Sequence, residues 1–289
     1  MPRTTATAIG FVAVLLWALL ALFTAASGAV PPLQLTAMSF AIAGFAGALS
    51  WPFRPNAMRA LRQGWRVWLL GVGGLFGYHF LYFSALRAAP AIDASLIAYL
   101  WPLLIVLMSA LAPGERLGAH HVIGAVLGFA GAILIVTGGR MVVPEAAYLP
   151  GYGLALLAAL FWSSYSVLSR RFAAVPTDVV TGFCLVTAVL ATLAHLALEE
   201  TVWPATTGQW LAVLGLGLGP VGLAFFAWDI GVKRGDIQVL GAASYAAPLL
   251  STFVLIAFGI GAFTWVIGLA SLLITAGAVL AAKDMLFRS

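Results

Sequence analysis

The sequence predicts an all-α membrane protein with ten transmembrane helices, arranged as two inverted five-helix repeats with both termini in the cytoplasm. Ten apolar stretches, each long enough to cross a bilayer, fill almost the whole chain. Hydrophobic residues make up 63% of the chain and charged residues 8%, so a soluble domain would lack polar surface to cover its core. A transmembrane β-barrel needs alternating segments of about 10 residues, whereas these stretches are continuous and about twice that length.

Short connections, often marked by proline or glycine, separate the apolar stretches, and none could hold a soluble domain. Five spans in each half place two related halves upside down relative to each other, which is typical of transporters. We therefore expect one integral membrane unit, with a first repeat at residues 1–139 and a second, inverted repeat at residues 140–289. The predicted spans are residues 5–27, 33–51, 67–86, 92–111, 121–138, 151–169, 179–198, 209–230, 237–258 and 263–282.

Lysines and arginines orient the chain. With the N-terminus in the cytoplasm, twelve of the 14 fall on the cytoplasmic side, and only Arg87 and Arg140 fall outside. This strong positive-inside bias predicts that both termini are cytoplasmic. A net charge of +5 would suggest nucleic acid in a soluble protein, but basic residues at helix ends are better suited to anionic lipid. The twelve residues are Arg3, Arg54, Arg59, Arg62, Arg66, Arg116, Arg170, Arg171, Lys233, Arg234, Lys283 and Arg288.

The two halves resemble each other at a steady offset. Trp17 matches Trp162, which lies 145 residues further on. Tyr99-Leu-Trp-Pro-Leu-Leu in the fourth span matches Tyr245-Ala-Ala-Pro-Leu-Leu in the ninth, at an offset of 146 residues. The shared pattern at corresponding places indicates that the halves are related copies. Further matches are Gly74 with Gly219, Gly77 with Gly222 and Arg87 with Lys233.

Aromatic and polar side chains near the bilayer centre are the candidate substrate-binding residues. Tryptophan and tyrosine usually concentrate at membrane interfaces, whereas these lie several turns inside, which favours a lined cavity. The alternative is that they pack helices together, with each hydroxyl bonded to a neighbouring backbone. The candidates, from the first, third, fourth, sixth and ninth spans, are Trp17, Tyr78, His79, Tyr82, Tyr99, Trp101, Trp162, Ser244 and Tyr245.

His79 is the only strongly titratable side chain deep within a span, and an ionisable group there is a functional candidate by default. The alternative is a neutral imidazole bonded to Tyr78 or Tyr82. All nine acidic residues lie at or near helix ends, and the deepest, Asp229, is expected at a cytoplasmic end that water can reach. Because proton-coupled carriers generally keep a carboxylate in the path, we expect facilitative transport, with His79 as the one group that could shuttle a proton.

Prolines and glycines at matching places are candidate helix breaks. A proline within a span removes a helical hydrogen bond and frees a carbonyl four residues back. Paired breaks of this kind in two halves point to a transport site. Glycine-rich stretches in the third and eighth spans allow either close packing or bending. The candidate break and hinge residues are Pro102, Pro248, Gly74, Gly77, Gly219 and Gly222.

Taken together, these features resemble the EamA group of the drug/metabolite transporter superfamily. The resemblance rests on the 5+5 arrangement, tryptophans early in both halves and prolines in the fourth and ninth spans. A Pro-Gly-Glu-Arg-Leu turn at residues 113–117, leading to Gly124 and Gly131, adds to it. It covers essentially the whole chain, and the richness in tryptophan and tyrosine is most like the bacterial aromatic amino-acid exporters. The second half departs from the first, because residues 259–263 hold no glutamate to match Glu115.

This resemblance implies a multi-pass secondary transporter of the bacterial inner membrane. Its expected function is export of small metabolites, amino acids including aromatic ones, by alternating access at a mid-membrane cavity. A drug or nucleotide-sugar carrier of the same fold is the runner-up, and a membrane enzyme or sensor is a third alternative. The sequence has no phosphate-binding loop and no His-Glu-x-x-His motif, which argues against an enzyme. We expect a small-molecule substrate, the lipid bilayer as surroundings, no nucleic-acid partner, no metal or other cofactor, no catalytic residues, and a monomer.

Overall fold

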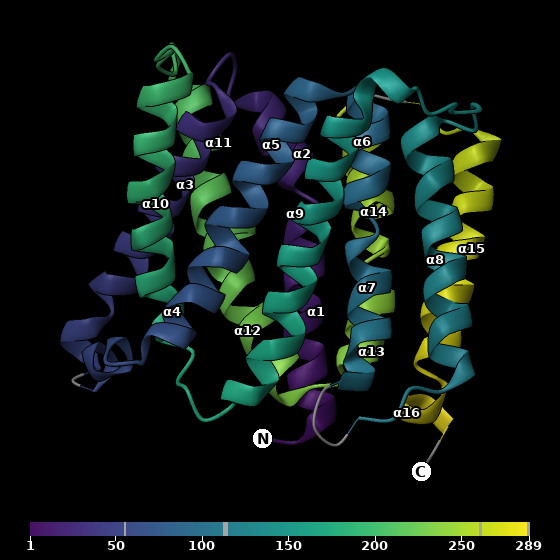
Figure 1. Cartoon of the computed structure of the whole chain (residues 1–289), viewed down its shortest axis with the longest axis horizontal. Helices are drawn as coiled ribbons and strands as arrows, with labels where there is room; N and C mark the ends of the chain where they lie inside the picture. Colours follow the sequence, from purple (N-terminus) through teal and green to yellow (C-terminus); the bar gives the residue numbers. More distant parts are fainter. Residues whose placement is uncertain (55, 112–114, 260–261, 288–289) are drawn as a thin grey trace.

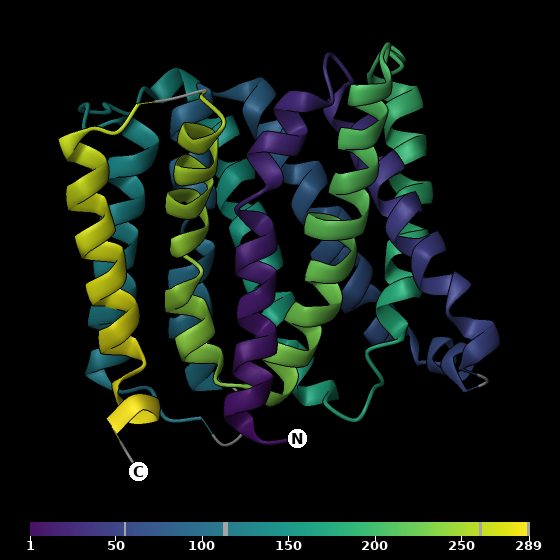
Figure 2. The ribbon, with the colours of Figure 1, turned by 180° about the vertical axis from the view of Figure 1, so that it is seen from behind.

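The computed structural model describes residues 1–54, 56–111, 115–259 and 262–287 as a bundle of helices that stand side by side (Figures 1 and 2). No strand occurs within these ranges. The first half holds α1 (Arg3–Trp17), α2 (Leu20–Ala26), α3 (Pro32–Leu49), η1 (Trp51–Phe53), η2 (Ala57–Leu61), α4 (Trp65–Val72), η3 (Gly73–Gly77), α5 (Tyr78–Ala88), α6 (Ala91–Ala98), α7 (Trp101–Met108), η4 (Ser109–Leu111) and α8 (Ala119–Thr137). The second half holds η5 (Ala146–Tyr148), α9 (Leu149–Leu168), η6 (Ser169–Phe172), α10 (Val179–Leu198), α11 (Thr207–Leu216), η7 (Gly217–Leu223), α12 (Ala224–Arg234), α13 (Ile237–Ala243), α14 (Ala246–Ala257), α15 (Trp265–Ala281) and α16 (Lys283–Phe287).

Nine helical runs in the described ranges are long and apolar enough to cross a membrane. Several of them join two or three of the shorter elements, as α4, η3 and α5 do over Trp65–Ala88. The last apolar helix, α15, has 17 residues, which is shorter than the roughly 20 that a span usually needs. The predicted all-helical membrane architecture is therefore confirmed, with nine clear candidate spans in the part of the chain that is described.

Helices of the two halves are paired with each other throughout the bundle. The close pairs are α1 with α12, α3 with α10, α5 with α9, α7 with α13 and α8 with α15. The first of these pairs is nearly in backbone contact, because a methyl group placed on Gly231 would lie 2.5 Å from the Cα atom of Gly10. Neither half is a separate layer, and any site at the centre is built from both.

The start of α1 and the end of α9 meet at the end of the bundle where both termini lie (Figures 1 and 2). Arg3, at the start of α1, and Arg170, just after α9, both bind Glu115 there. The first long helices of the two halves, α1 and α9, therefore run in opposite directions. The predicted boundary between residues 139 and 140 stays a prediction.

Two helices break at corresponding places, just ahead of a proline. α6 ends at Ala98 and α7 begins at Trp101, next to Pro102. α13 ends at Ala243 and α14 begins at Ala246, two residues before Pro248. The proline ring takes away an N–H group and displaces the carbonyl four residues back, which is where each first helix stops. A hinge role for these residues stays a prediction.

The glycine-rich stretches form two wide π-helical turns, η3 and η7, at matching places in the two halves. A methyl group at Gly74 would lie 2.4 Å from Cβ of Tyr165, and one at Gly77 would lie 2.6 Å from the ring of Phe161. Both glycines thus serve close packing against α9. Gly222 approaches its own backbone in η7, whereas a methyl group at Gly219 would have no neighbour closer than 3.8 Å.

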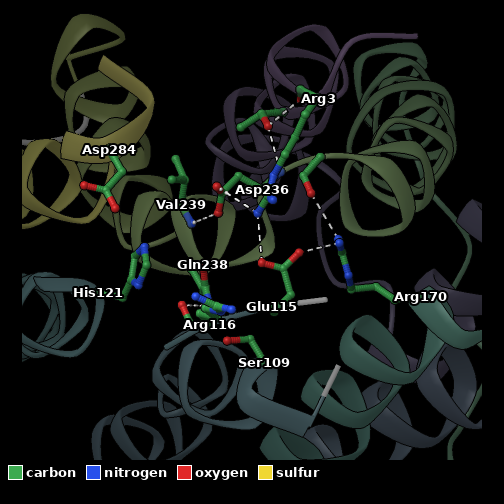
Figure 3. A network of polar contacts seen from close by, with 12 residues as sticks. Arg3, Ser109, Glu115, Arg116, His121, Arg170, Asp236, Gln238, Val239 and Asp284 are labelled. Carbon is green, nitrogen blue, oxygen red and sulfur yellow. Dashed lines mark hydrogen bonds and ion pairs between the residues drawn. The ribbon is translucent and has the colours of Figure 1, made fainter. Parts of the chain in front are cut away.

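A network of charged side chains ties the termini end of the bundle together (Figure 3). The carboxylate of Glu115 accepts from Arg3 at 2.8 Å and from Arg170 at 2.5 Å, and its side chain is 4% exposed. Arg3 also reaches Asp236 at 3.0 Å, and Arg170 donates to the Val232 carbonyl at 2.8 Å. The network joins the start of α1, the segment before α8, the end of α9 and the turn between α12 and α13. Residues 113–114 of the predicted turn, and residues 260–261 of its counterpart, lie outside the described ranges.

We expect the Glu115→Gln variant to lower the free energy of unfolding by about 3 kcal/mol, because two arginines lose the carboxylate that they share in a partly buried site. The matched control is Asp178→Asn, which removes the exposed pair between Arg54 and Asp178 and should cost less than about 1 kcal/mol. Thermal unfolding of the purified proteins in detergent measures both. Equal losses in the two variants would contradict a structural role for the buried network.

Candidate functional site

A cavity of about 300 Å³ lies at the centre of the bundle. Many of its walls come from α2, α5, α6 and α14, which lie in the half of the bundle away from both termini (Figures 1 and 2). Toward the termini the space is filled by packed side chains such as Val14 and Ile105, both fully buried. Seven of the nine predicted substrate-binding residues line the cavity: Trp17, Tyr78, His79, Tyr82, Tyr99, Trp101 and Trp162.

Tryptophan rings form the base of the cavity at mid-depth. The ring centroid of Trp17 lies 6.0 Å from that of Trp101 and 5.8 Å from that of Trp162, with the rings close to edge-on. Trp228 lies behind them, fully buried, at 5.0 Å from Trp17. Edge-to-face contacts at these distances are favourable between aromatic rings. The base is a preformed aromatic surface contributed by both halves.

Two hydrogen bonds fix the orientation of these rings. Nε1 of Trp17 donates to the carbonyl of Pro220 at 3.1 Å, within the π-helical turn η7. Nε1 of Trp228 donates to the hydroxyl of Ser166 at 3.0 Å. A buried indole N–H needs such a partner, and each bond here joins different helices. The position of the aromatic base is therefore coupled to the backbone of η7.

His79 is held by its own helix. Its Nδ1 atom donates to the carbonyl of Leu75 at 2.7 Å, because a carbonyl can only accept. The sequence-based alternative, a bond from the imidazole to Tyr78 or Tyr82, is thus wrong about the partner. When the imidazole is neutral, Nε2 is the acceptor, and it has no hydrogen-bond partner among the described residues. His79 therefore offers one free acceptor to the cavity.

Tyrosines form the polar part of the wall. Tyr78 and Tyr82 stack with ring centroids 5.9 Å apart, and the hydroxyl of Tyr82 lies 3.0 Å from that of Ser95. Tyr99, at the break between α6 and α7, also lines the cavity. None of the described lining residues is an aspartate, glutamate, lysine or arginine. The site is thus aromatic and uncharged, with a few hydroxyl groups and one imidazole.

Ser244 and Tyr245 do not line the cavity. The hydroxyl of Ser244 donates to the Leu240 carbonyl at 2.7 Å, and both predicted side chains are fully buried. The hydroxyl of Tyr245 accepts from the backbone N–H of Leu103 at 3.1 Å. That N–H lies four residues after Tyr99, where the first break has disrupted the helical ladder. Tyr245 therefore completes the backbone of the other half's broken helix.

Several lining residues were not among the predicted ones, and Phe225 is the most informative. It packs at 5.6 Å from Trp162 and at 5.4 Å from Phe40. An offset of 146 residues, which relates the first residues of α5 and α12, pairs Phe225 with His79. Extending this offset back from the matched pair of Arg87 and Lys233 would have identified Phe225. The other additional lining residues are Leu20, Ala21, Ser95, Ala98, Pro220, Val221, Ala247, Pro248 and Ser251.

Asp229 corrects one expectation from the sequence. The sequence predicts that water reaches Asp229, but the residue is only 1% exposed and is therefore buried. The carboxylate lies 2.9 Å from Nζ of Lys233 and accepts from the hydroxyl of Thr177 at 2.7 Å. Lys233 also donates to the Val175 carbonyl at 3.1 Å. The acid is buried because a lysine one turn later on the same helix folds back to neutralise it.

Comparison with known proteins places the chain in a family. The sequence pattern of the EamA-like transporter family matches it twice, at residues 4–137 and 149–282. The chain is similar to the aromatic amino acid exporter YddG of Ancylobacter novellus, with 54% identity over 97% of this chain and 98% of that protein. It is also similar to the aromatic amino acid exporter YddG of Salmonella typhimurium, with 26% identity over 87% of this chain and 88% of that one. A solved crystal structure with 52% identity has a TM-score of 0.93, covering 99% of this chain and 100% of the solved one. With two family matches that span most of its length, this protein belongs to the EamA-like transporter family.

Proposed function

We propose that this protein is a secondary transporter that exports amino acids, including aromatic ones, across the bacterial inner membrane by alternating access. The observation that carries the proposal is the uncharged aromatic cavity that both halves build at the centre of the bundle. The names of the two relatives, both aromatic amino acid exporters, support the choice of substrate. Because the whole cavity lies within one chain, a monomer suffices.

The dimensions of the cavity favour a single amino acid. Small-molecule sites generally measure about 300 to 1,000 Å³, and this one, at about 300 Å³, is at the lower limit. An aromatic substrate side chain can pack against Trp17, Trp101 and Trp162 in the same edge-on or offset geometry that the rings adopt with each other. A nucleotide sugar or a large drug would need a wider cavity in another conformation.

An amino acid in its zwitterionic form carries no net charge, which matches a wall without formal charges. The free Nε2 atom of His79 can accept a hydrogen bond from the substrate ammonium group. The hydroxyl groups of Tyr78 and Tyr99 can donate to the carboxylate. Neutral partners of this kind bind the substrate without a buried charge that would have to be neutralised when the site is empty.

Alternating access then requires the termini end to open. The cavity lies on the side of the tryptophan base that faces away from the termini. The network around Glu115 closes the bundle on the side of the termini. Opening would separate Arg3 and Arg170 from Glu115, with bending at the helix breaks and at η3 and η7. We assign the hinge role to Pro102 and Pro248 on this basis.

The proposed topology has ten spans, with α15 as the tenth, and two inverted repeats at residues 1–139 and 140–289. The twelve-to-two distribution of basic residues supports a cytoplasmic location for both termini. Two observations support this arrangement: both termini lie at one end of the bundle (Figure 1), and α1 and α9 run in opposite directions.

Cysteine accessibility tests the topology. In a background that carries Cys184→Ser, which removes the only native cysteine, Asn56→Cys should react with a membrane-impermeant reagent only in inside-out vesicles. Glu200→Cys, placed just after α10, should react only in intact cells. Labelling of Asn56→Cys from outside alone would overturn the orientation.

Substitution of the lining residues tests the site. Trp101→Ala and His79→Ala should each lower the rate of phenylalanine flux in liposomes by about fivefold or more, since each loses an interaction of about 1 kcal/mol or more with the substrate. Trp265→Ala is the matched control, because Trp265 is 75% exposed at the start of α15 and should keep full flux. Full flux in both lining variants, at equal amounts of folded protein, would contradict the site. Recovery of chemically altered substrate would instead indicate a membrane enzyme.

The absence of a carboxylate among the described lining residues supports facilitative transport. Liposomes with an imposed pH difference and no substrate gradient should therefore show no uphill accumulation. Accumulation that disappears in His79→Gln would show proton antiport through the imidazole. Accumulation that disappears in Asp229→Asn would assign coupling to the buried ion pair with Lys233.

A further inference from the structure

A second hollow, of about 510 Å³, lies on the outer side of the bundle and takes no part in the central cavity. Its walls come from α4, η3 and α5, with one side chain each from α9 and α10. Leu69, Phe161 and Val186 line it and are 65%, 43% and 36% exposed, so the groove opens sideways toward the bilayer. All its lining side chains are apolar, so its occupant must be apolar as well.

The length of the groove matches one lipid chain. It extends from Trp68 to Leu81, which is roughly 20 Å at 1.5 Å per residue. Half of the hydrocarbon core of a bilayer is about 15 Å thick. A single acyl chain from one leaflet can therefore lie along most of the groove.

The end of the groove nearest the termini is strongly basic. Residues 51–66 contain four arginines and no acidic residue. Arg54 pairs with Asp178 at 2.5 Å, whereas Arg59, Arg62 and Arg66 are exposed and make no ion pair with the described residues. This segment projects from the edge of the bundle below α4 and α10 (Figures 1 and 2).

Large apolar side chains lie among these arginines. Phe53, Met58 and Trp65 are 86%, 59% and 69% exposed, and the guanidinium of Arg66 lies 5.6 Å from the ring centre of Trp65. Arginines that alternate with exposed aromatic and aliphatic residues are typical of segments that lie in the headgroup region of a membrane. Trp68 and Leu69, where the groove begins, follow Trp65 by about one helical turn.

We propose that this groove is a binding site for an anionic phospholipid, with the phosphate held by Arg62 and Arg66 and one acyl chain in the groove. Charge complementarity favours an anionic lipid, because a negatively charged headgroup attracts the three arginines that have no acidic partner, whereas a headgroup without net charge does not. A second copy of the chain is disfavoured as the occupant, since a twofold interface would bring like-charged arginine clusters together.

The lipid contacts the same helix that carries the substrate side chains. Gly73 and Gly77 of η3 line the groove, while the next residues, Tyr78 and His79, line the central cavity. A bound chain would thus restrict bending at η3. This effect on transport rests on the proposed function, whereas lipid binding itself does not.

Binding is measured with purified protein in detergent, by native mass spectrometry with phosphatidylglycerol or phosphatidylcholine. Phosphatidylglycerol should bind more tightly. In Arg62→Gln/Arg66→Gln its binding should weaken roughly thirtyfold, since each basic residue near an anionic lipid contributes about fivefold. The matched control, Arg171→Gln/Arg234→Gln, removes two other exposed arginines near the termini end and should leave binding unchanged. Equal weakening in both double variants, or no preference for phosphatidylglycerol, would overturn the proposal.

The acyl chain is tested by filling the groove. Gly73→Leu places a side chain where a methyl group would meet no neighbour closer than 4.0 Å, so the protein should fold and bind phosphatidylglycerol at least tenfold more weakly. Gly153→Leu adds the same side chain at a helical glycine with open space and should bind normally. Unchanged binding in Gly73→Leu would show that the groove holds no chain. Flux in phosphatidylcholine liposomes, with and without phosphatidylglycerol, then tests the effect on transport: lipid binding without flux in either membrane would contradict the proposed function and leave the lipid site standing.

Discussion

The requirement that backbone groups be hydrogen-bonded within a bilayer is the constraint on which this structure depends. Two helices violate it near the membrane centre, at the breaks that precede Pro102 and Pro248. At the first break the Tyr245 hydroxyl accepts from the N–H of Leu103, and at the second the N–H groups of Tyr245 and Ala247 donate to nearby backbone carbonyls. Non-helical backbone at this depth is found where protein or a cavity surrounds it. The breaks and the cavity therefore occur together for a physical reason.

The two ends of the bundle are held by different chemistry. At the termini end, Glu115 gathers two arginines from different helices in a nearly buried site. At the opposite end, Glu199 accepts from Arg87 at 2.6 Å and from the backbone N–H groups at the start of α3. That carboxylate also lies 3.0 Å from the imidazole of His195. Each of these two carboxylates is nearly buried among basic partners, but the partners at the two ends differ.

Much of the fold could be predicted from hydropathy, because apolar length and charge at helix ends follow directly from the cost of burying polar groups in lipid. Internal repetition located Trp17, Trp162 and the prolines. Internal repetition does not reveal which way a side chain points after a helix breaks. It therefore predicts Ser244 and Tyr245 in the cavity wall, whereas both are buried against neighbouring backbone. The burial of Asp229 depends on a lysine folding back from the next turn, which spacing alone does not reveal. The π-helical turns η3 and η7 likewise leave no signal beyond their glycines.

The bond between Tyr245 and Leu103 has a consequence for biosynthesis. The two residues are 142 positions apart, so at 5 to 20 residues per second the hydroxyl is made roughly 7 to 28 s after the N–H that it must satisfy. Until Tyr245 has been made, the first half has one backbone donor without its final partner at the break between α6 and α7. The nascent first half must borrow a temporary partner, from water in the insertion machinery or from a lipid oxygen. Final packing of α7 therefore waits until the ninth helical run has been synthesised, and a pause in translation between the halves would extend the life of this incomplete state.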